Sequence, residues 1–89
     1  MSYMVIDDLI DDFAASMKNK IRERNDRYGS SWKTDSVATL FDHLIHEYSE
    51  AVDELRDSNY ERLAEEMIDI GACAMLVWNA AQRDINARG

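Results

Sequence analysis

The chain has 89 residues, of which 18 are acidic and 10 are basic, and its formal net charge is −8. This length predicts a single domain over residues 1–89, and the acidic excess argues against nucleic-acid binding, in which basic side chains must neutralise phosphates. The single cysteine, Cys73, excludes an internal disulfide, and no apolar run approaches the ~18 residues of a membrane span, so we expect a cytoplasmic protein without membrane contact.

Periodic apolar residues predict a first helix over about residues 3–27. One stripe at helical spacing consists of Ile6, Leu9, Ile10, Phe13, Met17 and Ile21. Acidic side chains fill the first turns of this helix and basic side chains fill the last, which complements the helix dipole. Residues 28–34 follow as a turn that contains Gly29, Trp32 and Lys33.

A second helix is predicted over residues 35–57, with Thr34 or Asp35 as its N-cap. Its broad apolar face consists of Val37, Leu40, Phe41, Leu44, Ile45, Tyr48, Val52 and Leu55. We expect this face to pack against the rest of the domain.

The third helix is predicted over residues 58–86 and begins at a capping box, in which Ser58 and Glu61 satisfy each other's backbone donors. Its core stripe consists of Leu63, Met67, Ile70, Ala74, Val77 and Ala81. Gly71 lies in a patch of small side chains, and a glycine inside a helix costs roughly 1 kcal/mol relative to alanine. Close approach of another helix would offset that cost; the alternative is that Gly71 is simply tolerated.

The connection between the second and third helices is so short that the two are expected to be antiparallel neighbours. The predicted fold class is therefore all-α, a helical hairpin plus an N-terminal helix. Three helices of this size have more apolar surface than one chain can cover. We therefore expect the bundle to be completed by oligomerisation, as a homodimer or a homotetramer.

Acidic residues gather along one flank of the predicted hairpin. Helical spacing places on this flank His43, Glu47, Glu50 and Glu54 of the second helix and Glu66 and Asp69 of the third. Clustered carboxylates repel one another and are costly to ionise when partly buried, and a divalent cation relieves both effects. Oxygen ligands favour magnesium, with manganese as the second choice. The alternative is a solvated acidic face without a metal.

The pattern Glu47-x-x-Glu50, fifteen further residues and Glu66-x-x-Asp69 resembles the acidic motif of the MazG-like all-α nucleotide pyrophosphohydrolases. The similarity covers about residues 13–79 and includes a series made of Phe13, Met17, Lys20, Ile21, Asn25, Gly29 and Trp32. The resemblance implies a MazG-like bundle of two or more chains that binds magnesium through the four acidic positions. It also implies an enzyme that hydrolyses a nucleoside triphosphate to a monophosphate and pyrophosphate.

The candidate catalytic residues are Glu47, Glu50 and Glu54, with Glu50 or Glu54 accepting the proton of the attacking water. Lys20 and Lys33 are the candidates for a cationic clamp on the phosphates. All five residues lie on the predicted helices or in the turn that joins the first two.

Trp32 is expected to stack on a nucleobase, with the alternative that it plugs the end of the hairpin. His43 stands where many MazG-like proteins have a lysine. It is a candidate donor to a substrate phosphate, or else a surface histidine paired with Glu47. These two residues complete the predicted substrate-binding set with the two lysines.

Four residues outside this set have simpler expected roles. His46 points away from Glu47 and is expected to be exposed or structural. Trp78 is expected in the core or in a subunit interface, and Cys73 in small core packing. Arg83 lies about 20 Å along the helix from the acidic cluster, so it could serve a partner's site but not easily its own.

Two rival functions remain open. An acidic helical protein can mimic the charge of DNA and occupy a basic groove on a partner. A catalytically weak relative would bind nucleotide without turning it over. A mimic spreads its acidic residues over exposed faces, whereas this chain sets its acidic pairs beside apolar stripes, which favours the enzyme.

Overall fold

The computed structural model describes residues 5–23 and 29–88, and this part of the chain contains helices and short connections but no strand. Its elements are α1 (Ile6–Glu23), the short 3₁₀ helix η1 (Ser31–Lys33), α3 (Val37–Arg56) and α4 (Tyr60–Arg88). The predicted all-α class is confirmed for these residues. The predicted extension of the first helix over residues 3–4 and 24–27, and residue 28 of the predicted turn, lie outside the described residues.

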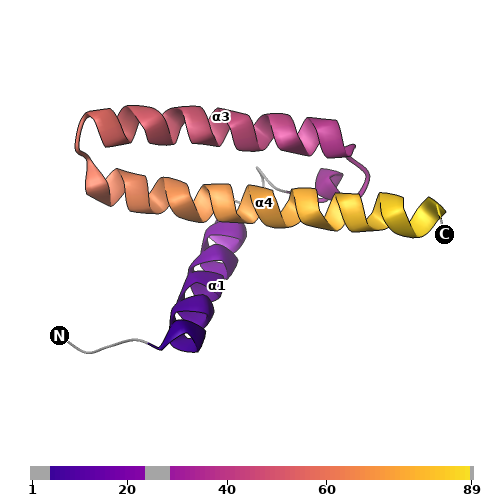
Figure 1. Ribbon diagram of the computed structural model, residues 1–89, viewed down its shortest axis with the longest axis horizontal. Coiled ribbons are helices and arrows are strands. Elements are labelled where there is room, and N and C mark those ends of the chain that lie inside the picture. The colour runs from indigo at the N-terminus through magenta and orange to yellow at the C-terminus, as the bar shows by residue number, and fades with distance from the viewer. Residues whose placement is uncertain (1–4, 24–28, 89) are drawn as a thin grey trace.

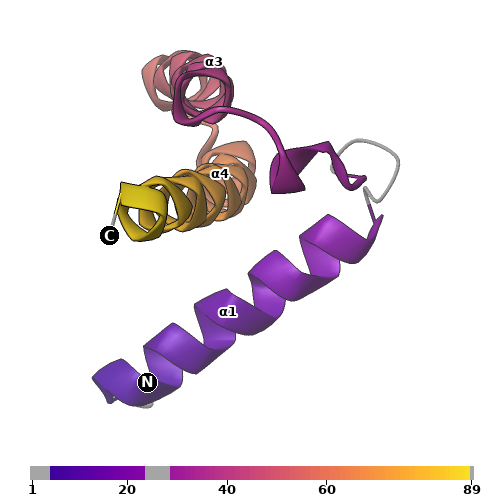
Figure 2. The same cartoon turned by 90° about the vertical axis from the view of Figure 1, so that its right-hand side faces the viewer.

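The helices form an antiparallel hairpin with one further helix across it. Figure 1 shows α3 and α4 side by side, with α1 running away from α4 at a steep angle. The view in Figure 2 shows that α1 lies beneath α4, on the side away from α3. The contacts of α4 with α3 are more extensive than those with α1. No helix in the described part of the chain is both long enough and apolar enough to cross a membrane.

The start of α3 differs from the prediction, because Ser36 is its N-cap rather than Thr34 or Asp35. The Ser36 hydroxyl accepts a hydrogen bond from the backbone N–H of Thr39 at 3.1 Å. Thr34 and Asp35 belong instead to the end of η1, where the N–H groups of both donate to the Ser31 carbonyl. Their backbones are therefore already bonded in a tight turn, and the helix begins after it.

The turn between α3 and α4 also corrects the prediction, because Ser58 ends one helix and does not cap the next. Ser58 has a φ of 54°, and its N–H donates to Leu55 O while the Asn59 N–H donates to Glu54 O. This pair of bonds is a Schellman motif, with Ser58 in the left-handed position usually taken by glycine. The Asn59 side chain then accepts from the N–H of Arg62 at 3.3 Å and caps α4.

The buried side chains of the α3–α4 hairpin are small residues, one leucine and three carboxylates. The buried residues of the described chain are Leu40, Glu47, Ala51, Glu66, Asp69, Ala72, Cys73 and Ala80. Burial of Cys73 agrees with its predicted role in core packing. Burial of three acidic residues in so small an interface is expensive unless their charge is compensated. This interface is therefore the place to look for a functional site.

Much of the predicted apolar core is exposed in the single chain, which corrects the prediction for the first helix most clearly. Ile6, Leu9 and Ile10 are each more than half exposed, because α1 contacts α4 through its C-terminal half and its first turns extend beyond α4. Exposed apolar side chains on the other two long helices are Phe41, Ile45, Tyr48, Leu55, Met67 and Trp78. These apolar side chains form unpartnered faces on all three long helices.

Side chains of α1 pack closely against Gly71 of α4, as the sequence suggested. A β-carbon on Gly71 would lie 2.6 Å from Cε1 and Cζ of Phe13 and 3.3 Å from Sδ of Met17. The first distance is shorter than real side chains tolerate, so the Phe13 ring would have to move. Glycine thus allows α1 to seat here and bring Lys20, one turn beyond Met17, to the acidic interface.

We expect Gly71→Ala to destabilise the protein by about 1 kcal/mol, because overpacking against Phe13 outweighs the gain in helix propensity. In a Phe13→Ala background the same substitution meets no ring and should stabilise the protein by about 1 kcal/mol. Urea unfolding of the four chains in this double-mutant cycle measures both effects. An effect of the same sign in both backgrounds would contradict the close approach.

Candidate functional site

Three buried carboxylates, one from α3 and two from α4, face one another in the hairpin interface. We call Glu47, Glu66 and Asp69 the acidic cluster; one oxygen from each lies within 4.8 Å of the others. Their residues are 2%, 8% and 2% exposed, respectively. The spacing of three between Glu66 and Asp69 sets both on the face of α4 that meets α3. Three oxygen ligands at such separations can enclose one small cation.

In the acidic cluster, ionisation of Glu66 is unfavourable. Burial raises the pKa of Glu66 from 4.5 to about 7. A hydrogen bond with Glu47 and the charge of Glu47 act in the same direction, followed by the charges of Glu50 and Asp69. Burial and the crowding of the carboxylates therefore both favour the protonated form of Glu66.

Two buried oxygens of the cluster also lack hydrogen-bond donors. Glu66 Oε2 and Asp69 Oδ1 accept no hydrogen bond from any residue in the described ranges 5–23 and 29–88. Buried polar atoms are normally satisfied, and each exception calls for an explanation such as an ion. The donor set consists of carboxylate oxygens, which suits magnesium, manganese or calcium rather than a soft metal.

Lys20 offsets part of the negative charge of the acidic cluster. Its Nζ lies 3.5 Å from Asp69 Oδ2, and its side chain is 14% exposed. This contact joins α1 to the cluster and depends on the close seating of α1 at Gly71. The sequence predicted Lys20 as a clamp on substrate phosphates; the structure places its ammonium group beside the cluster, where such phosphates would meet it.

The structure separates the fourth predicted ligand, Glu50, from the other three. Glu50 is not one of the carboxylates in the close group, and its side chain is 46% exposed. Its Oε1 lies 3.1 Å from Nε2 of His46, whose side chain is 70% exposed, as predicted for that histidine. Glu50 thus lies at the solvent rim of the cluster, near enough for its charge to affect Glu66. Glu54 is half-buried one turn further along α3, towards the hairpin loop.

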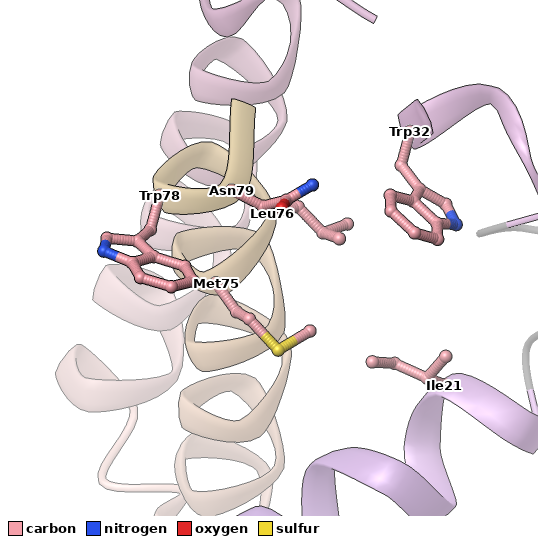
Figure 3. Close-up of a pocket in the computed structure, with 6 residues that line it drawn as sticks. All are labelled: Ile21, Trp32, Met75, Leu76, Trp78 and Asn79. Carbon is pink, nitrogen blue, oxygen red and sulfur yellow. The ribbon is translucent and has the colours of Figure 1, made fainter. Parts of the chain in front are cut away.

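A second feature is an apolar cavity of about 330 Å³ between α4, the end of α1 and η1. Its lining residues are Ile21, Trp32, Met75, Leu76, Trp78 and Asn79 (Figure 3). The indole of Trp32 lies opposite Leu76, and the Asn79 amide points towards Trp32. A cavity with aromatic and aliphatic walls and one amide suits a flat ring with a polar edge.

The cavity and the acidic cluster are neighbours on the same helices. Leu76 lies seven residues after Asp69, which is two turns along nearly the same face of α4 and about 10 Å along its axis. On α1, Ile21 of the cavity directly follows Lys20 of the cluster. A ligand with an aromatic ring at one end and negative charge at the other would span both features.

Hydrogen bonding within its own turn determines how Trp32 faces the cavity. Its Nε1 donates to the Gly29 carbonyl at 3.1 Å, in a turn where Gly29 has a φ of 45° that favours glycine. The indole N–H is therefore already used, and Trp32 offers a ligand only the surface of its ring. Lys33 Nζ lies 5.8 Å from the centroid of this ring, so it accompanies Trp32 rather than the cluster.

His43 lies at a second, smaller cavity of about 40 Å³. It shares this lining with Ser31, Trp32, Asp35, Leu40, Cys73 and Leu76. The side chain is exposed and stands one turn before Glu47 on α3. The structure therefore brings His43 to the Trp32 side of the site, between the two features.

Sequence reasoning missed part of this site. Asn79 could have been identified from the sequence, because it is a polar residue within an apolar stretch and lies ten residues after Asp69 on the same helix. Ile21 was assigned to the apolar stripe of the first helix and Leu76 was not assigned, because nothing in the sequence distinguishes a residue that lines a cavity from one that packs in a core. Arg83, a candidate for a partner's site, donates hydrogen bonds to the carbonyls of Lys33 and Asp35 in its own chain.

Comparisons with known proteins found no relative of this chain. No protein-family model matches the chain, and searches of curated proteins and of solved structures found no similar one. The function must therefore be argued from the acidic cluster and the neighbouring cavity themselves.

Proposed function

We propose that this protein is a MazG-like, divalent-cation-dependent hydrolase that cleaves nucleoside triphosphates to monophosphates and pyrophosphate. The observation that carries the proposal is the acidic cluster, three buried carboxylates from two helices with oxygens within 4.8 Å. The raised pKa of Glu66, and one buried oxygen each of Glu66 and Asp69 without a hydrogen-bond partner in the described chain, support a site that binds a small cation. Magnesium, or manganese in its place, matches this set of oxygen donors.

The adjacent cavity supports a nucleotide as the substrate. Stacking on an aromatic side chain is sequence-tolerant because every base has a π-face, and Trp32 offers its ring surface in this cavity. The cluster lies about 10 Å away along α4, a separation that suits a nucleotide with its base in the cavity and its phosphates at the carboxylates. The Asn79 amide is placed to meet the polar edge of the base.

In the proposed mechanism, each residue of the site has a role that follows from its position. Glu47, Glu66 and Asp69 would hold the cation, which would neutralise phosphate charge and make the attacking water more acidic. Glu50, at the solvent rim, accepts the proton as water attacks and the bond between the α- and β-phosphates breaks. Lys20 balances the charge of the departing pyrophosphate from beside Asp69.

Burial of the acidic cluster also separates this proposal from the DNA-mimic alternative. A mimic must display its negative charge to a partner, whereas Glu47 and Asp69 are each only 2% exposed. Their carboxylates face one another inside the hairpin and cannot form a surface pattern. The exposed acidic residues of the described chain lie outside this cluster.

Pyrophosphate release from a panel of ribo- and deoxyribonucleoside triphosphates tests the proposed function. We expect release with magnesium and none with a chelator. Binding of a triphosphate without release would identify the catalytically weak alternative. Absence of both binding and release with every triphosphate would overturn the proposal.

We further propose that the functional form is a homodimer, or a homotetramer built from it, in the cytoplasm. Large apolar side chains are exposed on α1, α3 and α4, and a chain this small gains much of its stability by covering them. Obligate interfaces of this kind are apolar and large. Light scattering at micromolar concentration should therefore report at least twice the mass of one chain. A monomeric mass would contradict this expectation.

A further inference from the structure

Arg83 ties the C-terminal part of α4 to the connection between η1 and α3. Its Nη2 donates to the Asp35 carbonyl at 2.7 Å, and its Nη1 donates to the Lys33 carbonyl. These two bonds join residues about 50 positions apart in the sequence. The planar guanidinium carries its donors in a fixed fork, so it can serve two carbonyls at once, whereas a lysine ammonium is a single point charge.

This clamp adjoins the apolar cavity. Arg83 lies four residues after Asn79 and seven after Leu76, so it occupies the next turn on the same face of α4. Lys33, whose carbonyl it holds, directly follows Trp32. Trp32 is in turn locked to its own turn through the Gly29 carbonyl. The position of the indole relative to α4 therefore depends on the anchoring of this segment.

We propose that Arg83 is a positioning residue, which holds the Trp32 wall of the cavity against α4 and so sets the affinity for nucleotide without touching it. The proposal rests on the proposed function, since it assigns the cavity to the base. Beside these two bonds, η1 and α4 meet at the apolar cavity, where Trp32 faces Leu76. Apolar contacts fix a distance less strictly than directed hydrogen bonds do. The effect should fall on substrate binding, because Arg83 is about 20 Å along α4 from the acidic cluster.

The clamp itself can be tested without substrate. In a Trp78→Phe background Trp32 is the only tryptophan, because the chain has two. We expect Arg83→Gln to increase acrylamide quenching of Trp32 fluorescence, with Arg83→Lys in between. Arg88→Gln, at an exposed position on the last turn of α4, removes the same charge and should leave quenching unchanged. Equal quenching in Arg83→Gln and its parent would overturn the proposal.

Kinetics then distinguish positioning from general structural support. With the otherwise native chain, Arg83→Gln should raise KM about tenfold and change kcat less than about twofold, since the loss of two charged hydrogen bonds loosens the Trp32 wall and leaves the acidic cluster intact. Partial recovery of KM in Arg83→Lys would support the proposal. A fall in kcat with unchanged KM would overturn it. If the parent releases no pyrophosphate, the proposed function fails while the quenching result still decides the clamp.

Discussion

Replacing Asp69 with asparagine should lower the turnover of nucleoside triphosphate by about a hundredfold or more. The amide keeps the size of the side chain but removes an anionic ligand from the acidic cluster. A bound cation contributes several kcal/mol to the transition state, and each 1.4 kcal/mol is about tenfold in rate. Initial rates of pyrophosphate release at saturating magnesium measure this effect.

Glu65→Gln is the matched control for Asp69→Asn. Glu65 lies one turn before Asp69 on α4, but it is exposed, so its substitution removes the same charge outside the cluster. We expect its turnover to match that of the parent. Because Asp69 also pairs with Lys20, thermal melts must show that the Asp69 variant is folded. Full activity of a folded Asp69→Asn chain would show that the acidic cluster has no catalytic role.

The second large effect is expected in the pH dependence of stability without divalent cations. The pKa of Glu66 is about 7 in the folded chain, against an ordinary value of 4.5. Between these values only the folded state holds the proton, so the free energy of unfolding falls as pH rises through this window. The total loss is on the order of 3 kcal/mol, because one pKa unit corresponds to about 1.4 kcal/mol.

Urea unfolding from pH 5 to pH 8 in the presence of a chelator measures this loss. Glu66→Gln removes the titrating group and should make the pH dependence much weaker. Magnesium should restore stability to the parent at pH 8, because a ligand that binds only the folded state stabilises it by mass action. Identical pH profiles for the parent and Glu66→Gln would contradict the raised pKa.

Helical periodicity was sufficient to predict the long helices, because α3 and α4 have apolar residues at regular spacing and a short connection. Their ends were less predictable. Ser36, Ser58 and Asn59 are all residues that cap or terminate helices, and the choice among them depends on which backbone groups are already bonded. Such bonds arise from the three-dimensional turn and leave no separate signal in the sequence.

The candidate site was predictable where one helix determines the geometry. Spacing within α4 predicted that Glu66 and Asp69 share a face, and the hairpin brought Glu47 to them. The rotation of α3 about its axis was not predictable, and it leaves Glu50 at the solvent rim. The contacts of Arg83 within its own chain were not predictable for a similar reason, since a distance along one helix says nothing about which loop folds back upon it.

Manganese binding to the protein alone tests the central claim most directly, because it requires neither substrate nor turnover. Electron paramagnetic resonance reports free manganese during titration of the parent, Asp69→Asn and Glu65→Gln at pH 8. If the acidic cluster holds the cation, the parent and Glu65→Gln bind manganese saturably with the same affinity, and Asp69→Asn binds at least tenfold more weakly. Equal binding by all three chains, or none by the parent, would contradict a metal site formed by Glu47, Glu66 and Asp69.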